Sequence, residues 1–347
     1  MNAIRPRLLR AIDREPLDRP PIWFMRQAGR CLPEYRELRA KAGGFLSLCL
    51  NPQTAAEVTL QPVRRLAYDA AIVFADILIL PMALGQELWF ETGEGPRLGP
   101  LPDIASLEMR IGAATEQLAS VGETLRRVRA ELAPERALIG FAGGPWTVAT
   151  YMLVGRGGEA ARAAARQMAL DDPARVERLV DVLAEASIPY LAMQARAGAQ
   201  ALQIFESWAE ALPEPALFER LVIRPHAAIV RGLRALGVTT PVIGFPRGAA
   251  DALVERYAEA SGVQVVGLGV DASAELGARL QRTVAIQGAL DPILLRAGGP
   301  ALAARVDEML RQWSGGPYIF NLGHGVLQDT PVEHLEAVVS QVTAWRA

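Results

Sequence analysis

The stretch DPARVERLVDVLAEASIPYLAMQARAGAQALQIFE, residues 172–206, carries a helix signal followed at once by a strand signal. Its first part, residues 172–198, repeats apolar residues at helical spacing, with Asp172 at its start and Gly198 at its end. Those residue types are common at the two ends of a helix. The run ALQIFE, residues 201–206, is short, apolar and bounded like a buried strand. The stretch therefore predicts a helix that leads directly into a strand.

The same alternation of short apolar runs and longer amphipathic stretches, such as residues 116–133, extends along the 347 residues. The eight strand-like runs are PPIWFM (20–25), AAIVFA (70–75), ALIGFA (137–142), ALQIFE (201–206), PVIGFP (241–246), VQVVGL (263–268), VAIQGA (284–289) and PYIFNL (317–322). Eight strands with intervening helices are typical of a barrel, and runs that are apolar throughout suit parallel strands covered by helices. We therefore predict an α/β fold, a (β/α)8 TIM barrel that forms a single domain over residues 1–347.

An open, doubly wound sheet is the alternative fold for this pattern. It would need a glycine-rich phosphate-binding turn after a strand, and the chain contains no GxGxxG. The segment ELWFETGEGPRLGP, residues 87–100, alternates and turns like a β-hairpin, and we expect it to leave the barrel as an excursion near its top.

Composition excludes several classes of function. Lys and Arg total 36 and Asp and Glu total 38, so the net charge of −2 does not favour nucleic acid or an acidic membrane surface as a partner. The two cysteines and three histidines show no zinc-binding spacing, so we expect no metal. Lys41 is the single lysine, which excludes a GK[ST] phosphate loop.

The most apolar segment, residues 70–85, is interrupted by Asp76 and Pro81 and is shorter than a membrane span. The N-terminal residues have no apolar core of signal-peptide length. Together with the two cysteines, these features lead us to expect a cytoplasmic protein without a membrane partner.

Catalytic residues of a barrel lie at the carboxyl ends of its strands, so the residues that follow each run are the candidates. Arg26, Gln27 and Arg30 follow the first run, and forked guanidiniums suit the binding of carboxylates. Equally, the two arginines could be a solvated pair bonded to nearby carboxylates such as Glu34. Asp76 lies among apolar residues, where a carboxylate needs a partner, either as a helix cap or as a functional group.

The later runs supply further candidates. Tyr151 follows the third run, although a tyrosine is more often a core residue, and the fourth run ends in Phe205, Glu206 and Ser207. Ser207 lacks the GxSxG context of a nucleophile, which favours hydrogen bonding or capping. His324, flanked by two glycines after the last run, is poorly explained as a core residue and is a candidate for function. The other two histidines, His226 and His334, are predicted to be structural.

These segments resemble a known family along nearly the whole chain. PPIWFMRQAGRCLPEYR (20–36) and IGFAGGPWTVATYMLVGRG (139–157) resemble the two signatures of the uroporphyrinogen decarboxylase family. Further similar segments follow in the same order: FADILILP (74–81), residues 203–209, GFPRG (244–248), QGALDP (287–292) and YIFNLGHGVLQDTP (318–331). The departures are Cys31 where the family usually has Tyr, Ala289 where Asn is common, and residues 266–271, which lack the usual Asp-Trp.

The resemblance implies an enzyme that removes CO2 from the four acetate side chains of uroporphyrinogen III to give coproporphyrinogen III, on the route to haem. It implies that no cofactor is needed and that two barrels form a homodimer. By position it makes Asp76, Arg26, Tyr151 and His324 the catalytic candidates, with Gln27, Arg30, Phe205 and Ser207 positioning the substrate. Asp76 would lie where the four pyrrole N–H groups converge.

The identity of the proton donor stays open between three of these residues. Arginine is a poor donor because its pKa exceeds about 12, whereas the ordinary pKa of histidine, about 6.5, is better suited, and Tyr151 is a third possibility. Two other functions compete with the decarboxylase: a related barrel methyltransferase, which would need zinc held by Cys and His, and a tetrapyrrole carrier that binds without turnover.

Overall fold

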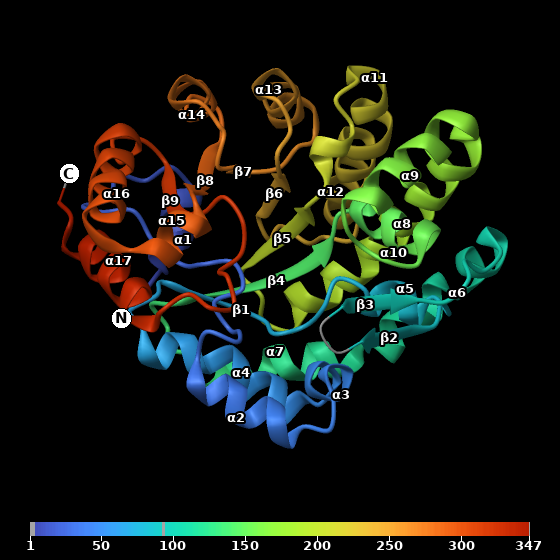
Figure 1. The fold of residues 1–347 in the computed structure, drawn as a ribbon, viewed down its shortest axis with the longest axis horizontal. Helices are drawn as coiled ribbons and strands as arrows, with labels where there is room; N and C mark the ends of the chain where they lie inside the picture. The colour runs from blue at the N-terminus through green and yellow to red at the C-terminus, as the bar shows by residue number, and fades with distance from the viewer. Residues whose placement is uncertain (1–3, 92–93, 347) are drawn as a thin grey trace.

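The computed structural model describes residues 4–91 and 94–346, and its centre is a curved sheet of seven parallel strands surrounded by helices (Figure 1). The strands are paired in the order β1-β4-β5-β6-β7-β8-β9, so that each neighbour in space is the next barrel strand along the chain. Their bounds are β1 Ala70–Ile72, β4 Ala137–Gly143, β5 Ala201–Glu206, β6 Val242–Pro246, β7 Val265–Leu268, β8 Ala285–Leu290 and β9 Tyr318–Leu322. The predicted barrel is confirmed, and seven of the eight predicted runs form its strands.

The first predicted strand, residues 20–25, is present only as a single bridge that closes the barrel. Ile22 bridges Phe320 of β9 in parallel, and the N–H of Asp69 donates to the carbonyl of Ile22 at 2.8 Å on the other side. Pro20 and Pro21 have no N–H to give to a ladder, and the N–H of Ile22 donates instead to the Asp69 carboxylate at 2.8 Å. The expectation of eight regular strands was therefore wrong at this one position, although the segment fills the gap between β9 and β1.

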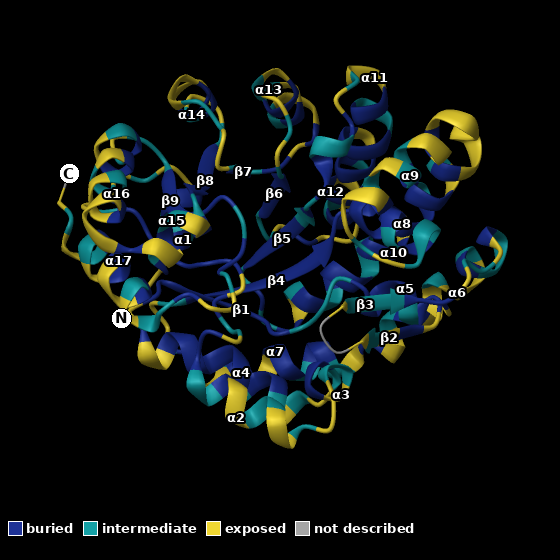
Figure 2. Cartoon of the chain, viewed as in Figure 1, coloured by how far each residue is buried: buried dark blue, intermediate teal, exposed yellow. Residues whose placement is uncertain are grey.

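Helices cover the outside of the sheet and are buried on the face that meets it (Figure 2). Their bounds are α1 Arg7–Ile12, α2 Pro33–Lys41, α3 Phe45–Leu50, α4 Pro52–Arg65, α5 Ile79–Ala83, α6 Ile104–Gln117, α7 Ala119–Glu131, α8 Pro145–Val154, α9 Glu159–Asp171, α10 Pro173–Arg196, α11 Pro215–Phe218, α12 Arg224–Ala235, α13 Asp251–Ala260, α14 Ala274–Leu280, α15 Pro292–Ala297, α16 Gly299–Trp313 and α17 Val332–Ala344. Short 3-10 and π-helical turns lie at Ala209–Ala211 and Glu219–Ile223.

The two predicted helical stretches are both found, one with a shifted start. Asp172 caps α10 by accepting the N–H of Arg175 at 3.2 Å, and Gly198 follows the helix in a left-handed conformation with φ of 116°. The other predicted stretch, residues 116–133, covers the last two residues of α6 and the whole of α7. The two helices are separated at Leu118.

The predicted hairpin is formed by β2 Leu88–Glu91 and β3 Gly95–Leu98, which pair antiparallel, while residues 92–93 of its turn lie outside the described residues. β3 also contacts the segment that follows α8: Arg97 bridges Arg156, and the N–H of Leu98 donates to the carbonyl of Gly155 at 2.8 Å. The hairpin is thus fastened to the loop between α8 and α9, and its Pro96 lies on the side of the barrel that carries the strand ends. Among the described residues, no helix is both long and apolar enough to cross a membrane.

The interior of the barrel is closed by buried side chains that form a short polar chain. The indole N–H of Trp23 donates to Oε1 of Gln287 at 2.9 Å, and Nε2 of Gln287 donates to Oε1 of Gln203 at 3.2 Å. All three side chains are fully buried, so the barrel has a packed centre and no pore. A ligand at the strand ends would therefore lie above this layer.

Candidate active site

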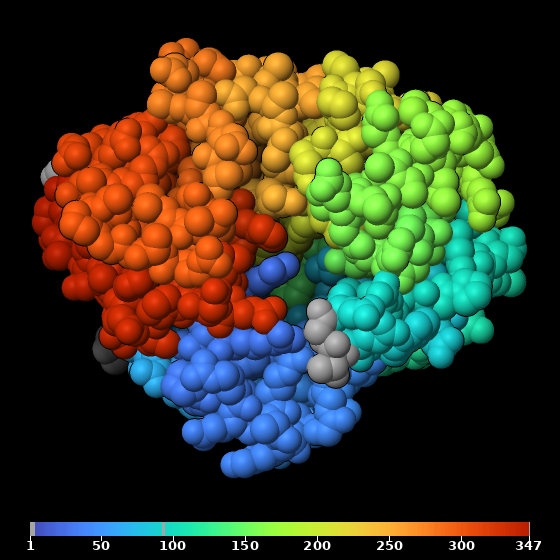
Figure 3. Space-filling model, viewed as in Figure 1, coloured from blue at the N-terminus to red at the C-terminus, as the bar shows by residue number. Residues whose placement is uncertain are grey.

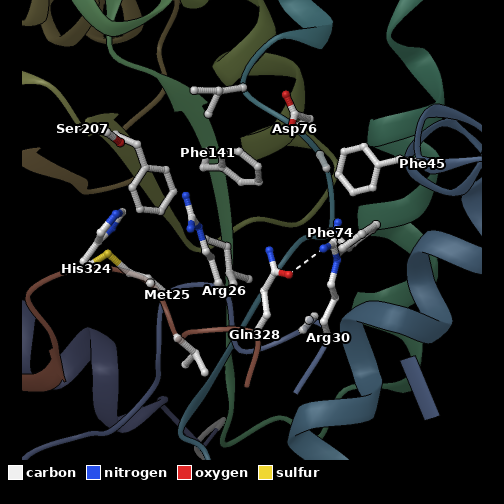
Figure 4. Close-up of a pocket in the computed structure, with 18 of the residues that line it drawn as sticks. Met25, Arg26, Arg30, Phe45, Phe74, Asp76, Phe141, Ser207, His324 and Gln328 are labelled. Carbon is white, nitrogen blue, oxygen red and sulfur yellow. Dashed lines mark hydrogen bonds between the residues drawn. The ribbon is translucent and has the colours of Figure 1, made fainter. Parts of the chain in front are cut away.

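A cavity of about 370 Å³ opens at the carboxyl ends of the strands, and it appears as a hollow in the middle of the face in Figure 3. Seven of the eight predicted site residues line it. Most follow or end a strand, while Tyr151 stands on α8, and the seven are Arg26, Arg30, Asp76, Tyr151, Phe205, Ser207 and His324. The cavity therefore collects side chains that are separated by up to three hundred residues in the chain. Figure 4 shows how several of them face one another.

Arg26 projects into the middle of this cavity from a strained turn. Its backbone is left-handed, with φ of 59°, in a turn closed by the N–H of Gln27 donating to the carbonyl of Phe24 at 3.1 Å. The turn is anchored from both sides of Met25, whose N–H donates to Asn321 Oδ1 at 3.1 Å and whose carbonyl accepts the N–H of Val326 at 2.9 Å. A non-glycine residue in this conformation carries strain that the surrounding structure must hold, as is common at functional sites.

The absence of a side chain at Gly325 leaves the space through which the Arg26 side chain enters the cavity. A Cβ at Gly325 would lie 2.3 Å from Cδ of Arg26 and 2.6 Å from its Cγ. One of the two glycines that flank His324 is thus explained. Position 325 must be glycine because the side chain of Arg26, from near the N-terminus, occupies the space that a Cβ would take.

We predict that Gly325→Ala lowers kcat/KM by roughly tenfold or more because the added methyl group displaces the Arg26 side chain, and about an ångström of misplacement can cost a hundredfold. The matched control is Gly315→Ala, since a Cβ at Gly315 meets no atom within 4 Å. Steady-state kinetics of both variants check this, and activity of Gly325→Ala equal to that of the control would contradict it.

Gln27 lies outside the lining of the cavity. It is buried behind the wall, where its Oε1 accepts the N–H of Phe24 at 3.2 Å and its Nε2 donates to the carbonyl of Ala70 at 3.1 Å. Its amide thus ties the Arg26 turn to β1. The structure places Gln27 as a support for Arg26, and not where a substrate could reach it.

Arg30 lies at the exposed edge of the cavity. Its Nη1 donates to Oε1 of Gln328 at 2.5 Å, which is the hydrogen bond drawn in Figure 4. Gln328 lies in the loop after β9, so this bond joins the first and last strand positions across the cavity edge. The alternative partner considered for the two arginines, Glu34, instead pairs with Arg65 at 2.8 Å.

Asp76 reaches the cavity from the segment after β1, between apolar neighbours. Its Oδ1 accepts the N–H of Leu78 at 2.8 Å, a short-range bond of the kind expected from a capping residue. Burial raises the pKa of Asp76 above its ordinary value, while the Leu78 N–H and the charge of Arg26 act in the opposite direction. The carboxyl group is therefore partly desolvated and has capacity to accept further hydrogen bonds from a ligand.

Tyr151 stands on α8, with its ring centroid 4.3 Å from the ring of Trp208. Burial raises the pKa of Tyr151 to about 12, so its hydroxyl keeps its proton at neutral pH. Another part of the wall is apolar, where Phe141 and Phe205 meet edge to face at 5.5 Å.

His324 is neutral in this cavity. Burial, followed by the charges of Arg26 and Arg247, lowers the pKa of His324 to about 3. The expectation that its ordinary pKa suits it to donate a proton was therefore wrong, because two guanidiniums and a desolvated position disfavour the imidazolium. The neutral ring can still donate or accept a hydrogen bond.

Sequence reasoning missed the aromatic and amphipathic part of the wall. Phe45 of α3, Phe74 after β1 and Phe141 of β4 line the cavity, and the guanidinium of Arg39 lies 5.5 Å from the Phe45 ring centre. Phenylalanines in apolar runs have the same signal as core residues. The position of Phe74, two residues before Asp76, was the one indication in the sequence.

A metal centre has no ligand set in the part of the chain that the structure describes, because no three His, Cys, Asp or Glu side chains are grouped there. Cys31 lines the cavity, but burial raises the pKa of its thiol to about 11, and Cys49 is buried elsewhere in the core. The zinc thiolate that a methyltransferase would need is thus not supported by these residues. Both other histidines lie outside the cavity lining: His226 is fully buried, and Nδ1 of His334 lies 3.1 Å from the carbonyl oxygen of Leu295.

Known proteins match this chain closely in sequence. Among curated relatives, the uroporphyrinogen decarboxylase of Phenylobacterium zucineum (strain HLK1) is 62% identical over 99% of both chains. That of Caulobacter vibrioides (strain NA1000 / CB15N) is 60% identical over 97% of this chain and 95% of the relative. Among solved structures, a methyltransferase from Methanosarcina mazei has a TM-score of 0.77 with 20% identity over 97% of each chain, a likeness of fold. The family description "Uroporphyrinogen decarboxylase (URO-D)" matches residues 4–345, and the chain therefore belongs to this family.

Proposed function

We propose that this chain is a carboxy-lyase that removes CO2 from the four acetate side chains of uroporphyrinogen III and releases coproporphyrinogen III, without a cofactor. The family supports the reaction, and one observation in the site carries it: a partly desolvated carboxyl, Asp76, lines a cavity into which Arg26 projects, with Arg30 at its exposed edge. That arrangement suits a ligand with a donor-rich centre and an anionic periphery.

The substrate supplies both features. Its four pyrrole N–H groups point toward the middle of a flexible macrocycle, and its eight carboxylates extend outward. An ionised carboxyl has about four acceptor positions and no donor, so Asp76 can accept the converging N–H groups. The forked donors of Arg26 and Arg30 can bind carboxylate arms. Phe141 and Phe205 offer the apolar surface on which pyrrole rings can lie.

The chemistry needs an electron sink, which the pyrrole itself can provide. Protonation of a ring carbon gives a cation; the bond to the departing CO2 then breaks, and its electron pair forms an exocyclic C=C bond while neutralising the cation. A proton added to the exocyclic carbon produces the methyl group, and loss of the ring-carbon proton restores the pyrrole. Asp76 beside the ring stabilises the positive charge as it develops.

We propose that Asp76 acts in its ionised form and that His324 does not supply the proton. Burial raises the pKa of Asp76 above its ordinary value, although the charge of Arg26 opposes this, and burial lowers the pKa of His324 to about 3. A group donates protons best when its pKa lies near the working pH, so the imidazolium of His324 is not available as the acid at neutral pH. Arg26 then supplies a fixed positive charge for the substrate carboxylates beside the one that leaves as CO2. Tyr151 and His324 act as neutral hydrogen-bonding groups.

We predict that His324 contributes no ionisation to the activity between pH 5 and 9. The pH profiles of kcat/KM for the wild type and for His324→Asn should have the same shape, although the variant is less active. An inflection near pH 6.5 that disappears in the variant would contradict this prediction.

Acid unfolding provides a second measurement of the same group. Because the folded pKa of His324 lies below its unfolded value, the unfolded state binds more protons between about pH 6.5 and pH 3. His324 therefore destabilises the fold as the pH falls through that window. His324→Asn should lose less stability than the wild type between pH 6.5 and 4, as measured by thermal unfolding.

The experiment that tests the function is an anaerobic incubation of the purified protein with uroporphyrinogen III and no added cofactor, followed by oxidation and separation by carboxylate number. Products with seven, six, five and four carboxylates are expected. Binding of the substrate without turnover would instead indicate a tetrapyrrole carrier. Unchanged substrate with folded protein and no binding would overturn the assignment.

We also propose that the protein acts in the cytoplasm as a homodimer, as the family resemblance implies. Sedimentation velocity across a range of protein concentrations checks the assembly. A single species of about the mass of one chain, 37.4 kDa, in the presence of full activity would contradict the dimer.

A further inference from the structure

Glu206, at the end of β5, is a fully buried carboxylate that the proposed reaction does not use. It lies directly before Ser207 in the chain, but its side chain turns away from the cavity into the protein. Both of its oxygens accept hydrogen bonds from the first turn of α8: the N–H of Thr147 donates to Oε1 at 2.7 Å, and the N–H of Trp146 donates to Oε2 at 3.2 Å. The hydroxyl of Thr147 also donates to Oε1.

A second set of contacts holds the carboxylate from behind. Nε2 of His226 lies 3.2 Å from Oε2 of Glu206, and Nδ1 of the same ring lies 2.7 Å from the hydroxyl of Tyr257. In the neutral ring, a proton on Nε2 faces the carboxylate oxygen, and Nδ1 then accepts the hydroxyl proton of Tyr257. These three side chains are completely buried and form one hydrogen-bonded row.

Two backbone positions lie so close to this row of side chains that only glycine fits there. A Cβ at Gly144 would lie 2.4 Å from Oε2 of Glu206, and a Cβ at Gly244 would lie 1.9 Å from the Tyr257 hydroxyl. Neither position has space for any side chain while the row is in place. The second glycine of the GGPWT segment is therefore explained by Glu206, and not by a phosphate or another ligand.

The contacts of Glu206 lead by short steps to the cavity wall. The Thr147 hydroxyl accepts the N–H of Trp208 at 3.2 Å, and the indole N–H of Trp146 donates to the carbonyl of Trp208 at 3.2 Å. Trp208 packs against Tyr151, which stands one turn further along α8 from Thr147. The Tyr151 ring is placed by its own helix, α8, and by Trp208. Both are thus connected by hydrogen bonds to the Glu206 carboxylate.

We propose that Glu206 is a positioning residue of this active site, which fixes the first turn of α8 and thereby holds Tyr151 against Trp208 at the cavity wall. The inference rests on the proposed contact between Tyr151 and the substrate. Glu206 itself reaches neither the cavity nor the reacting atoms. Its effect on the reaction passes through the placement of a ring whose hydroxyl must meet the substrate at hydrogen-bonding distance.

The main variant is Glu206→Gln, which keeps the size of the side chain but replaces one acceptor oxygen with an NH2 group facing an N–H donor. We expect kcat to fall about tenfold, with a smaller change in KM, because misplacement of a positioned group affects the rate first. The control is Asp291→Asn, since Asp291 also caps a helix at a strand end, accepting the N–H of Ile293 at 2.7 Å, but α15 carries no predicted site residue. Its kcat should equal that of the wild type.

A double-mutant cycle with Tyr151→Phe distinguishes positioning from general loss of structure. If Glu206 acts through Tyr151, the double variant should be no slower than Tyr151→Phe alone. Multiplication of the two single effects would overturn the proposal. If Glu206→Gln does not fold, Thr147→Val and Thr147→Ser replace it: the valine variant should lose roughly threefold in kcat, and the serine variant, which keeps the hydroxyl, should retain the wild-type rate.

Hydrogen exchange of the full-length protein supplies a readout that is independent of activity. The amides of Trp146 and Thr147 should exchange faster in Glu206→Gln than in the wild type, while those of α15 stay unchanged. If Tyr151→Phe proves fully active, the proposed role of Tyr151 fails, yet faster exchange still supports Glu206 as the residue that fixes α8. Unchanged exchange in the first turn of α8 overturns the inference in either case.

Discussion

Asp76→Asn should lower kcat/KM with uroporphyrinogen III by about 10²- to 10³-fold while leaving the fold intact. The asparagine keeps the shape of the side chain and one acceptor oxygen but removes the negative charge that would face the developing cation. Loss of one fixed group that stabilises charge in a transition state typically costs this much. Measurement of the seven-carboxylate product under anaerobic conditions checks the rate of the first decarboxylation.

The stability of the same variant should move in the opposite direction. Burial raises the pKa of Asp76, so at neutral pH the folded state holds a charge that its surroundings disfavour, and unfolding relieves that penalty. Asp76→Asn should therefore unfold at the same or a higher temperature than the wild type at pH 7. The difference should shrink as the pH falls and the wild-type carboxyl becomes protonated in both states.

The outcome separates two explanations for a loss of activity. Lower activity with equal or higher stability assigns the loss to the chemistry of the carboxyl group. Near-wild-type turnover would contradict the role of Asp76 as the central acceptor. A large drop in melting temperature would instead make Asp76 a structural cap of the Leu78 turn, the alternative reading of its bond to the N–H of Leu78.

Much of the fold could be predicted because the barrel strands repeat one local signal. The run 201–206 coincides with β5, and Asp172 caps α10 as its residue type suggests. The exception is the first strand, where Pro20 and Pro21 withhold two donors and Asp69 takes a third. The Asp69 carboxylate takes the N–H of Ile22 that a neighbouring strand would otherwise accept. Asp69 lies almost fifty positions further along the chain, so no local pattern around Ile22 reveals this contact.

The site was predictable as a set of polar residues at strand ends, but their individual roles depended on three-dimensional contacts. Gln27 and Glu206 carry the same signal as Arg26 and Ser207, yet both turn away from the cavity and hold backbone turns. The pKa of His324 is lowered by its burial and then by Arg26 and Arg247, which approach it from other strand ends. The sequence shows the residue type and its place at a strand end. It does not show whether the side chain points into the cavity or away from it.

Arg26 offers the second large expected effect. Arg26→Gln should lower kcat/KM by roughly a hundredfold, since hydrogen bonds to charged groups are worth about 1.5–3 kcal/mol each and a guanidinium can make two to one carboxylate. Arg26→Lys keeps the charge but loses the fork, and should retain more activity than the glutamine variant. Both replacements keep a side chain in the left-handed backbone position, so the strain of the turn, with φ of 59°, is the same in each.

The matched control for Arg26 is Arg178→Gln, which removes an exposed arginine from α10 that pairs with Glu108 at 2.7 Å, away from the cavity. An exposed ion pair of this kind contributes little to stability, so the control should keep the wild-type kcat/KM. The salt dependence provides a further distinction: added salt should weaken substrate binding by the wild type more than by Arg26→Gln, because one of the screened attractions is already gone. Turnover of Arg26→Gln within twofold of the control would show that the carboxylates of the substrate are bound elsewhere. In that case the strained turn, Gln27 behind it and Gly325 in front of it would serve only to close the barrel at its incomplete first strand.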